Sequence, residues 1–173
     1  MTMRMRTLAG LCGLALLALS LGAQEAAEGK SSTKLPAGWK EEQPTNAMRF
    51  AQYKLTKVPG DDADAELVVF KGLGGSADAN IERWKGTFAK GVEAKISDYS
   101  GPLGKGKMID AKGTYLYKSQ PFNPNAKSEE KPNYAMVGLH VEGDAVYHIR
   151  LTGPAKTVAK HREAFEGWLK SFK

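Results

Sequence analysis

The chain has 173 residues, of which 42% are hydrophobic and 25% are charged, and its formal net charge at pH 7 is +6. This length and apolar content suffice for one domain that is held together by its core. The basic residues are scattered among Asp and Glu and form no stripe with aromatic residues between them, which argues against nucleic-acid binding. The one cysteine, Cys12, lies in the first apolar segment, so we expect no disulfide, no thiolate nucleophile and no cysteine metal ligand in the fold.

Residues 1–23 have the pattern of a secretory signal peptide. Arg4 and Arg6 give a positive start, residues 8–21 are apolar, and the small Ala23 offers a cleavage site. The apolar run is shorter than a membrane span needs. We therefore expect export to the periplasm or the extracellular space, with no stable membrane insertion after cleavage.

Residues 24–34 are small and polar, which predicts a flexible linker, and a single domain is expected to span residues 35–173. In the first part of this domain, residues 48–55 alternate between apolar and polar side chains, and residues 65–70 are mostly apolar. Both patterns are typical of strands, and the Pro-Gly-Asp-Asp turn between them favours a hairpin.

Two segments have the apolar spacing of amphipathic helices. The first follows Gly75, is capped by Ser76 or Asp78, and is expected to end near Gly91. The second begins at Pro154, a residue that suits the first turn of a helix. The apolar faces comprise Ile81, Trp84 and Phe88 in the first helix and Val158, His161, Phe165, Trp168 and Phe172 in the second.

Residues 95–99 and 107–117 predict two further strands, and residues 134–142 and 145–152 predict a second hairpin around a Gly-Asp turn. Strands in hairpins, together with two well-separated helices, indicate the α+β class. We expect an antiparallel β-sheet built from hairpins, with the two amphipathic helices packed on it.

The segment between the two pairs of strands, residues 119–133, is rich in Pro, Asn, Lys and Glu and lacks periodicity. It predicts a loop that is unusually long for a compact domain, and such loops are either functional or disordered. Phe122 is its only large apolar residue, so we expect this side chain to pin the loop to the body or to contact a partner.

Several segments resemble an uncharacterised family of exported bacterial proteins, which is similar to the wider PsbP-like group of α/β/α sandwiches. They are residues 36–39 (Pro-Ala-Gly-Trp), 48–53, 65–70, 80–84 (Asn-Ile-Glu-Arg-Trp), 149–158 and 169–172. The matching residues are structural ones, and no catalytic signature comes with them. PsbP-like domains generally act as binding or assembly modules, so the resemblance implies a non-enzymatic role.

The second hairpin yields the most specific geometric prediction. Its alternating apolar residues are Val137, Leu139 and Val141 in one strand and Tyr147, Ile149 and Leu151 in the other. If both sets face one core, His140 lies directly opposite His148, with Glu142 and Arg150 nearby. A two-residue Gly-Asp turn would instead shift the register by one residue and place the two histidines on opposite faces.

Two cross-strand imidazoles can share a transition metal, and a carboxylate could complete the site. His140 and His148 are therefore the candidate metal ligands. The interpretation that we favour is a pair of ordinary polar residues of the sheet, packed under a helix. No other cofactor is indicated.

Three further motifs fit structural roles. The acidic residues 61–66 lack the full spacing of a calcium loop and fit a solvated hairpin turn. The glycine-rich residues 72–76 match neither nucleotide-binding pattern and fit a strand-to-helix connection. His161 lies on an apolar helical stripe, where a satisfied buried histidine is more common than a ligand.

Together these observations predict an exported, non-enzymatic binding or assembly module. Its recognition surface would comprise the 119–133 loop and the exposed sheet face near His140, His148 and Arg150, with Phe122 and Arg150 as partner-binding residues. A cell-envelope protein is the expected partner, and neither the ligand nor the oligomeric state follows from the sequence. The alternative is a metal-binding protein that uses His140 and His148. A hydrolase is the weakest hypothesis, because no nucleophile motif supports it.

Overall fold

The computed structural model describes residues 35–119, 123 and 125–172. The predicted signal peptide, the predicted linker and Phe122 lie outside the described residues. The described strands are β1 (Trp39–Glu42), β2 (Ala51–Leu55), β3 (Ala65–Lys71), β4 (Glu93–Gly101), β5 (Gly104–Tyr117), β6 (Glu129–Glu142) and β7 (Val146–Pro154), and the helices are α1 (Ala77–Lys85) and α2 (Ala155–Lys170).

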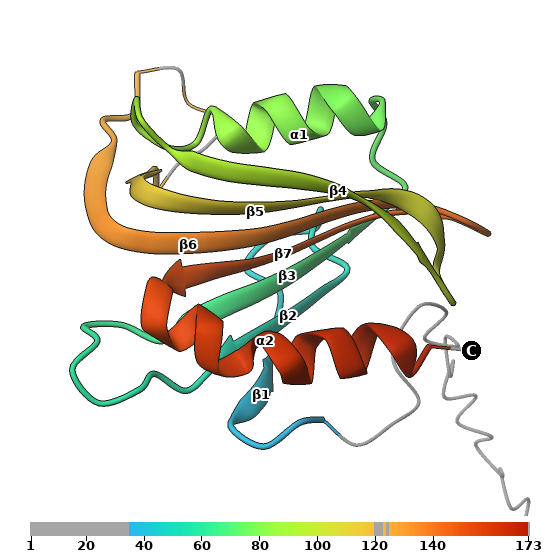
Figure 1. Cartoon of the computed structure of the whole chain (residues 1–173), viewed down its shortest axis with the longest axis horizontal. Coiled ribbons are helices and arrows are strands. Elements are labelled where there is room, and N and C mark those ends of the chain that lie inside the picture. The colour runs from blue at the N-terminus through green and yellow to red at the C-terminus, as the bar shows by residue number, and fades with distance from the viewer. Residues whose placement is uncertain (1–34, 120–122, 124, 173) are drawn as a thin grey trace, which may run out of the picture.

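The seven described strands form one sheet in the order β1-β2-β3-β7-β6-β5-β4, and every neighbouring pair is antiparallel. Two meanders, β1–β3 and β4–β7, meet where β7 pairs with β3. Helix α1 covers one face of the sheet and α2 covers the other (Figure 1). The α+β class, with an antiparallel sheet and two packed helices, is therefore confirmed.

The register of the second hairpin follows the first of the two alternatives. Val141 lies opposite Tyr147, Leu139 opposite Ile149, and His140 opposite His148. The connection contains three residues rather than two, because Glu142 pairs with Val146. This register lets both apolar sets face α2 in one core, which a shift by one residue would destroy.

Three boundaries differ from the expected ones. Helix α1 ends at Lys85 with Gly86 as its C-cap, not near Gly91, and Phe88 is buried just beyond the helix, where it bridges to Tyr115. The expected loop is shorter, because residues 129–133 belong to β6 and pair with the end of β5. Residues 39–42, for which the sequence predicts no strand, form the edge strand β1.

The side chains between sheet and helices form two hydrophobic clusters, one on each face. The larger lies under α2 and contains Trp39, Leu67, Leu139, Ile149, Phe165 and Trp168 among others. The smaller lies under α1 and comprises Ile81, Trp84, Phe88, Ile109, Ala111 and Met136. Because α1 is only 9 residues long, its own hydrogen bonds cannot hold it, and its burial against β5 and β6 must do so.

Gly138 gives α1 the space to approach the sheet. A Cβ atom at this position would lie 2.7 Å from Trp84 Cε3 and 3.0 Å from Ile109 Cγ2. Both distances are shorter than van der Waals contact, and both neighbours are fully buried. The indole ring of Trp84 therefore rests directly on the backbone of β6, which only glycine permits.

We expect Gly138→Ala to lower the free energy of unfolding by about 1–3 kcal/mol, because the added methyl overpacks the α1 layer. Urea unfolding monitored by tryptophan fluorescence measures this effect. The matched control is Gly167→Ala on α2, where a Cβ meets nothing within 4 Å. That variant should gain up to about 1 kcal/mol from helix propensity. Equal effects at the two sites would contradict the packing argument.

Candidate functional site

The structure brings the two predicted histidines together on the face under α1. His148 Nε2 lies 2.9 Å from His140 Nδ1, and His140 Nε2 lies 2.9 Å from Glu142 Oε1. The exposed fractions of the two histidines are 0% and 1%, and the edge of Trp84 packs against His148. The expectation of an exposed sheet face at this place is therefore wrong, because α1 covers it.

The hydrogen bonds define how the protons are placed. A carboxylate only accepts, so His140 Nε2 carries the proton toward Glu142. His140 Nδ1 and His148 Nε2 share the second hydrogen bond, and the tautomer decides which of them donates. The remaining nitrogen, His148 Nδ1, is buried and has no hydrogen-bond partner among the described residues. The pair thus forms a hydrogen-bonded chain that begins at the surface carboxylate of Glu142 and ends in the core.

This arrangement leaves little room for a metal ion between the histidines. The two nitrogens that would have to share the metal already share a hydrogen bond. In the described part of the chain, no three His, Cys, Asp or Glu side chains are grouped closely enough to hold a metal ion. The metal site at His140 and His148 stays a prediction.

Zinc titration of the purified protein at pH 7.5 tests the paired-histidine site. We expect one equivalent of zinc to leave the Tm unchanged, because binding must break the hydrogen bond between the rings. A zinc-dependent rise in Tm that disappears in His148→Ala would contradict this expectation and establish the site.

Burial lowers the pKa of His148 to about 4, and the neighbouring His140, Arg83 and Arg150 act in the same direction. The ordinary pKa of histidine is 6.5. Between pH 6.5 and pH 4, His148 is therefore protonated in the unfolded chain but not in the folded protein. The folded state must therefore lose stability as the pH falls from 6.5 toward 4.

We expect this histidine to account for about 3 kcal/mol of the stability lost between pH 6.5 and pH 4. In His148→Gln the amide can still donate to His140 but takes up no proton. Urea unfolding of both proteins at pH 7.5 and at pH 4 measures the contribution as the difference between their losses. Identical losses in both proteins would show that His148 does not carry the effect.

A second group of polar side chains lies on the same face, beyond the C-terminal end of α1. It surrounds a pocket of about 570 Å³ between β3, β7 and the ends of the β5–β6 loop. The polar and charged lining residues are Arg49, Glu66, Thr87, Tyr115, Lys118, Ser128, Arg150 and Thr152. Val68 and Leu116 add apolar surface, so the pocket combines cations with an apolar wall.

Arg150, the predicted partner-binding residue, lines this pocket. Its guanidinium carbon lies 5.3 Å from the centre of the Phe70 ring, and its Nε is buried without a hydrogen-bond partner among the described residues. No ion pair to Arg150 occurs within the described ranges. Burial lowers its pKa, the charges of Arg83 and Arg49 add to this shift, and Tyr115 and Glu66 oppose it. An arginine remains protonated nonetheless, so this is a mostly buried charge without a carboxylate partner.

Arg49 lies on the opposite side of the pocket and has its own carboxylate. Its Nη1 lies 2.6 Å from Glu66 Oε1 and donates to Gln52 Oε1 at 2.8 Å. Glu66 thus neutralises Arg49, and the charge of Arg150 is left over. Residues 119–128 contain one lysine and no acidic residue, so this adjoining segment offers no counter-charge. The pocket carries a net positive charge.

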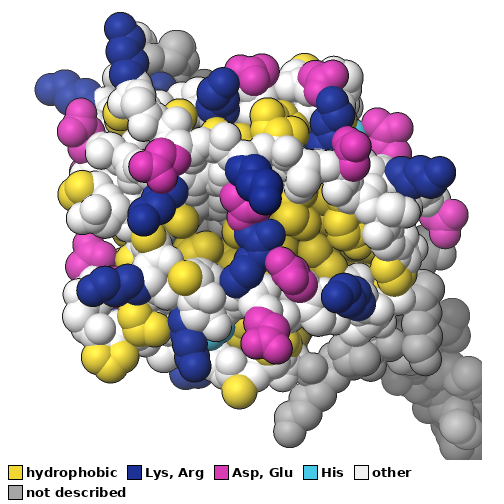
Figure 2. Space-filling view, in the orientation of Figure 1, with side chains coloured by type: hydrophobic (Ala, Val, Ile, Leu, Met, Phe, Trp, Pro, Cys, Tyr) yellow, Lys and Arg dark blue, Asp and Glu magenta, His cyan; other side chains and the backbone are white. Residues whose placement is uncertain are grey.

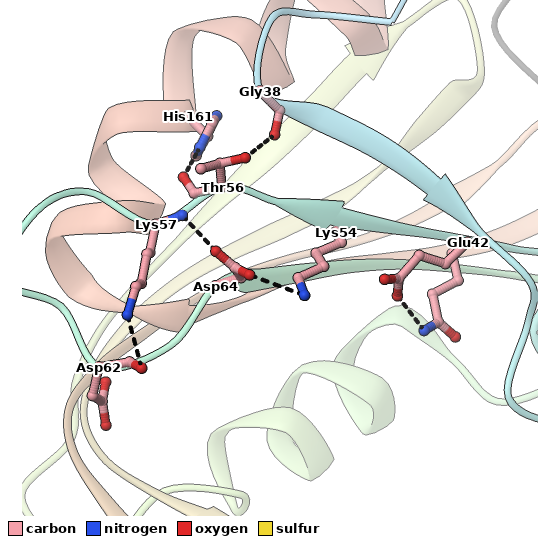
Figure 3. Close-up of polar contacts among 9 residues, drawn as sticks. Gly38, Glu42, Lys54, Thr56, Lys57, Asp62, Asp64 and His161 are labelled. Atoms are coloured by element: carbon pink, nitrogen blue, oxygen red, sulfur yellow. Dashed lines mark hydrogen bonds and ion pairs between the residues drawn. The ribbon is translucent and has the colours of Figure 1, made fainter.

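The remaining polar motifs have structural partners. Asp64 accepts from the Lys57 N–H at 2.7 Å and pairs with Lys54 at 3.1 Å (Figure 3). The Lys57 N–H lowers the pKa of this carboxyl group. Asp61 accepts from the backbone and side chain of Thr157, in the first turn of α2. The acidic turn thus holds the β2–β3 hairpin to α2.

His161 is satisfied, as the sequence predicted. Its Nε2 lies 2.9 Å from the Thr56 carbonyl oxygen, and its Nδ1 accepts from Trp39 Nε1 at 3.2 Å. Figure 3 shows His161 beside Thr56, whose hydroxyl reaches the Gly38 carbonyl. Both ring nitrogens are used, so this histidine ties α2 to β1 and β2 and is not available to a ligand.

No model of a known protein family matches the chain, and no curated protein matches it. Neither helix in the described part of the chain combines the length and apolar content that a membrane span requires. Of the predicted site residues, the structure joins His140 to His148 and places Arg150 in the pocket. Sequence reasoning missed Arg49 and Tyr115, because no local pattern links either residue to Arg150, which lies far along the chain from both.

Proposed function

We propose that the protein is an exported, non-enzymatic binding module that holds an anionic group of its ligand or partner in the Arg49–Arg150 pocket. The observation that carries the proposal is the mostly buried, unpaired charge of Arg150. A charge without a partner is costly to bury, and proteins keep such a charge where something else pairs with it. A bound carboxylate or phosphate would supply the missing counter-charge.

The shape of the groups supports an oxyanion rather than a halide. A guanidinium presents a planar fork of N–H donors that matches the oxygens of a carboxylate or phosphate. The hydroxyl groups of Tyr115 and Thr152 line the same pocket and can donate further hydrogen bonds, whereas the Thr87 hydroxyl already donates to the Trp84 carbonyl oxygen. The apolar wall of Val68 and Leu116 would contact the non-polar remainder of the ligand.

The partner in this proposal is a cell-envelope protein that presents an acidic side chain or a chain terminus. Lys118 and Ser128, the two ends of the β5–β6 loop, line the pocket. A partner anchored on Arg150 would therefore meet this loop, and Phe122 within it is the proposed apolar contact. The position of the pocket beside the loop favours a binding role for both.

The architecture supports the proposed PsbP-like relationship, but it does not indicate which ligand is bound. Two antiparallel meanders joined in one sheet, with a helix on each face, fit the sandwich that the sequence resemblance implies. Domains of that group generally act as binding or assembly modules. The metal-binding alternative is less well supported, because His140 and His148 already share a hydrogen bond and the other ring nitrogen of His140 is bonded to Glu142.

Arg150→Met tests the proposal, because methionine keeps much of the side-chain length and removes the charge. We expect inorganic phosphate and acetate to bind the wild-type protein in calorimetric titrations at low salt, and the variant to bind at least about tenfold more weakly. The unliganded variant should also unfold at a higher temperature, because a buried unpaired charge has been removed.

The control is Lys160→Met, which makes the same change of charge at an exposed position of α2. It should leave both anion binding and the Tm nearly unchanged. Two results would contradict the proposal. One is equal anion binding by wild type and Arg150→Met, and the other is a lower Tm in Arg150→Met without any change in binding.

A further inference from the structure

The opposite face of the sheet carries a second, larger depression. A groove of about 670 Å³ lies between the first half of α2 and the strands β4, β5 and β6. Figure 2 shows a hollow with hydrophobic side chains, surrounded by Lys, Arg, Asp and Glu, on the side where α2 and β4 face the viewer. Grooves of about 300–1,000 Å³ are typical of sites for small organic ligands.

The groove exists because the sheet is wider than the helix that covers it. Helix α2 contacts β6 and β7, whereas the edge strand β4 extends beyond it and is largely exposed. On the helix side, Ala155 and Ala159 line the groove together with Val158, and their short side chains leave the space open. On the sheet side, Ala135 and Val137 complete an apolar floor.

Arg162 links α2 to β5 and so helps to set the separation between the helix and this strand. Its guanidinium pairs with Asp110 on β5, and its Nε lies 2.7 Å from Glu166 one turn further along the helix. A side chain that spans from helix to sheet in this way sets the width of the groove. Because Asp110 is paired with Arg162, its negative charge is balanced and does not repel an anionic ligand.

The charge at the rim is predominantly positive. Lys95, Lys112 and Lys156 line the groove and form no ion pair within the described ranges. Glu93, opposite Lys112 in the β4–β5 register, is the remaining carboxylate of the lining. An apolar floor with three unpaired ammonium groups is complementary to a molecule that has an apolar chain and a negatively charged end.

We propose that this groove binds a single-chain amphiphile with an anionic head group, such as a fatty acid. The acyl chain lies on the alanine and valine floor, where burial of each methylene group is favourable. The carboxylate lies at the rim, where the lysine side chains can reach it while their stems cover the chain. This site is independent of the Arg49–Arg150 pocket, which lies on the other face of the sheet.

The test uses dodecanoate below its micellar concentration, titrated calorimetrically into the purified full chain with Arg150→Met, so that the arginine pocket does not compete for the carboxylate. The variants that follow are made in the same background. We expect one equivalent to bind, and dodecyltrimethylammonium, which has the opposite charge, to bind at least about tenfold more weakly. In Ala159→Trp the indole fills the groove, so dodecanoate binding should be lost. Ala159→Leu is a smaller blocking variant and should weaken binding if the tryptophan variant does not fold.

Two further variants show whether dodecanoate occupies this groove. Glu163→Trp places the same indole on a position of α2 that does not line the groove, and it should bind normally. The triple change Lys95→Gln, Lys112→Gln and Lys156→Gln should weaken dodecanoate binding by about tenfold.

Either of two results would overturn the proposal. The first is no binding of dodecanoate to Arg150→Met. If the protein with Arg150 intact still binds it, the carboxylate lies in the arginine pocket instead. The second is unchanged binding in the blocking variants of Ala159.

Discussion

The antiparallel ladder between β3 and β7 is the interaction on which the rest of the described structure depends. It joins residues 66–71 to residues 147–152 and turns two separate meanders into one sheet. On one face it aligns Leu67 with Leu151 and Val69 with Ile149 in the core under α2. On the other it sets Arg150 beside Val68 and the ring of Phe70. A slip of one residue would exchange these two sets, so packing of the core and placement of the charge are set together.

The same face of the sheet carries two kinds of buried polar group, and they differ in whether their hydrogen bonds are satisfied. His140 is bonded at both ring nitrogens and belongs to the architecture, as does His161 on the other side of the sheet. Arg150 has only an aromatic ring beside it and opens on a pocket. Buried polar groups that lack partners mark the places where a ligand can gain most, because these groups have already lost their water. His148 Nδ1 also lacks a partner among the described residues, but it is enclosed under α1, whereas Arg150 is charged and lines a pocket. The arginine pocket is therefore favoured over the histidine pair as the binding site.

Where the sequence predictions held, local chemistry and core packing agreed. Ser76 caps α1 through its side chain, and the apolar alternation of β6 and β7 specifies their register. Where they were wrong, contacts between residues far apart in the sequence determined where the helix or strand ends. Glu129 and Glu130 look like loop residues, yet they continue β6 because the end of β5 offers them a partner. Helix α1 stops at Gly86 because the following residues turn to pair with β5, through Ala89 and Thr114 and through Thr87 and Leu116.

The amino-acid sequence by itself determined the α+β class, the two helices and the hairpins, and it left two registers open for His140 and His148. Periodicity and caps act between residues that are near in the chain, so they can be read from it. The tertiary structure alone decided that α1 buries the histidines and that α2 leaves a groove beside β4. It also decided that Glu66 forms its ion pair with Arg49, so that Arg150 has no ion-pair partner among the described residues. These outcomes depend on which strands become neighbours and on how far each helix reaches across the sheet, and no pattern within one segment records either.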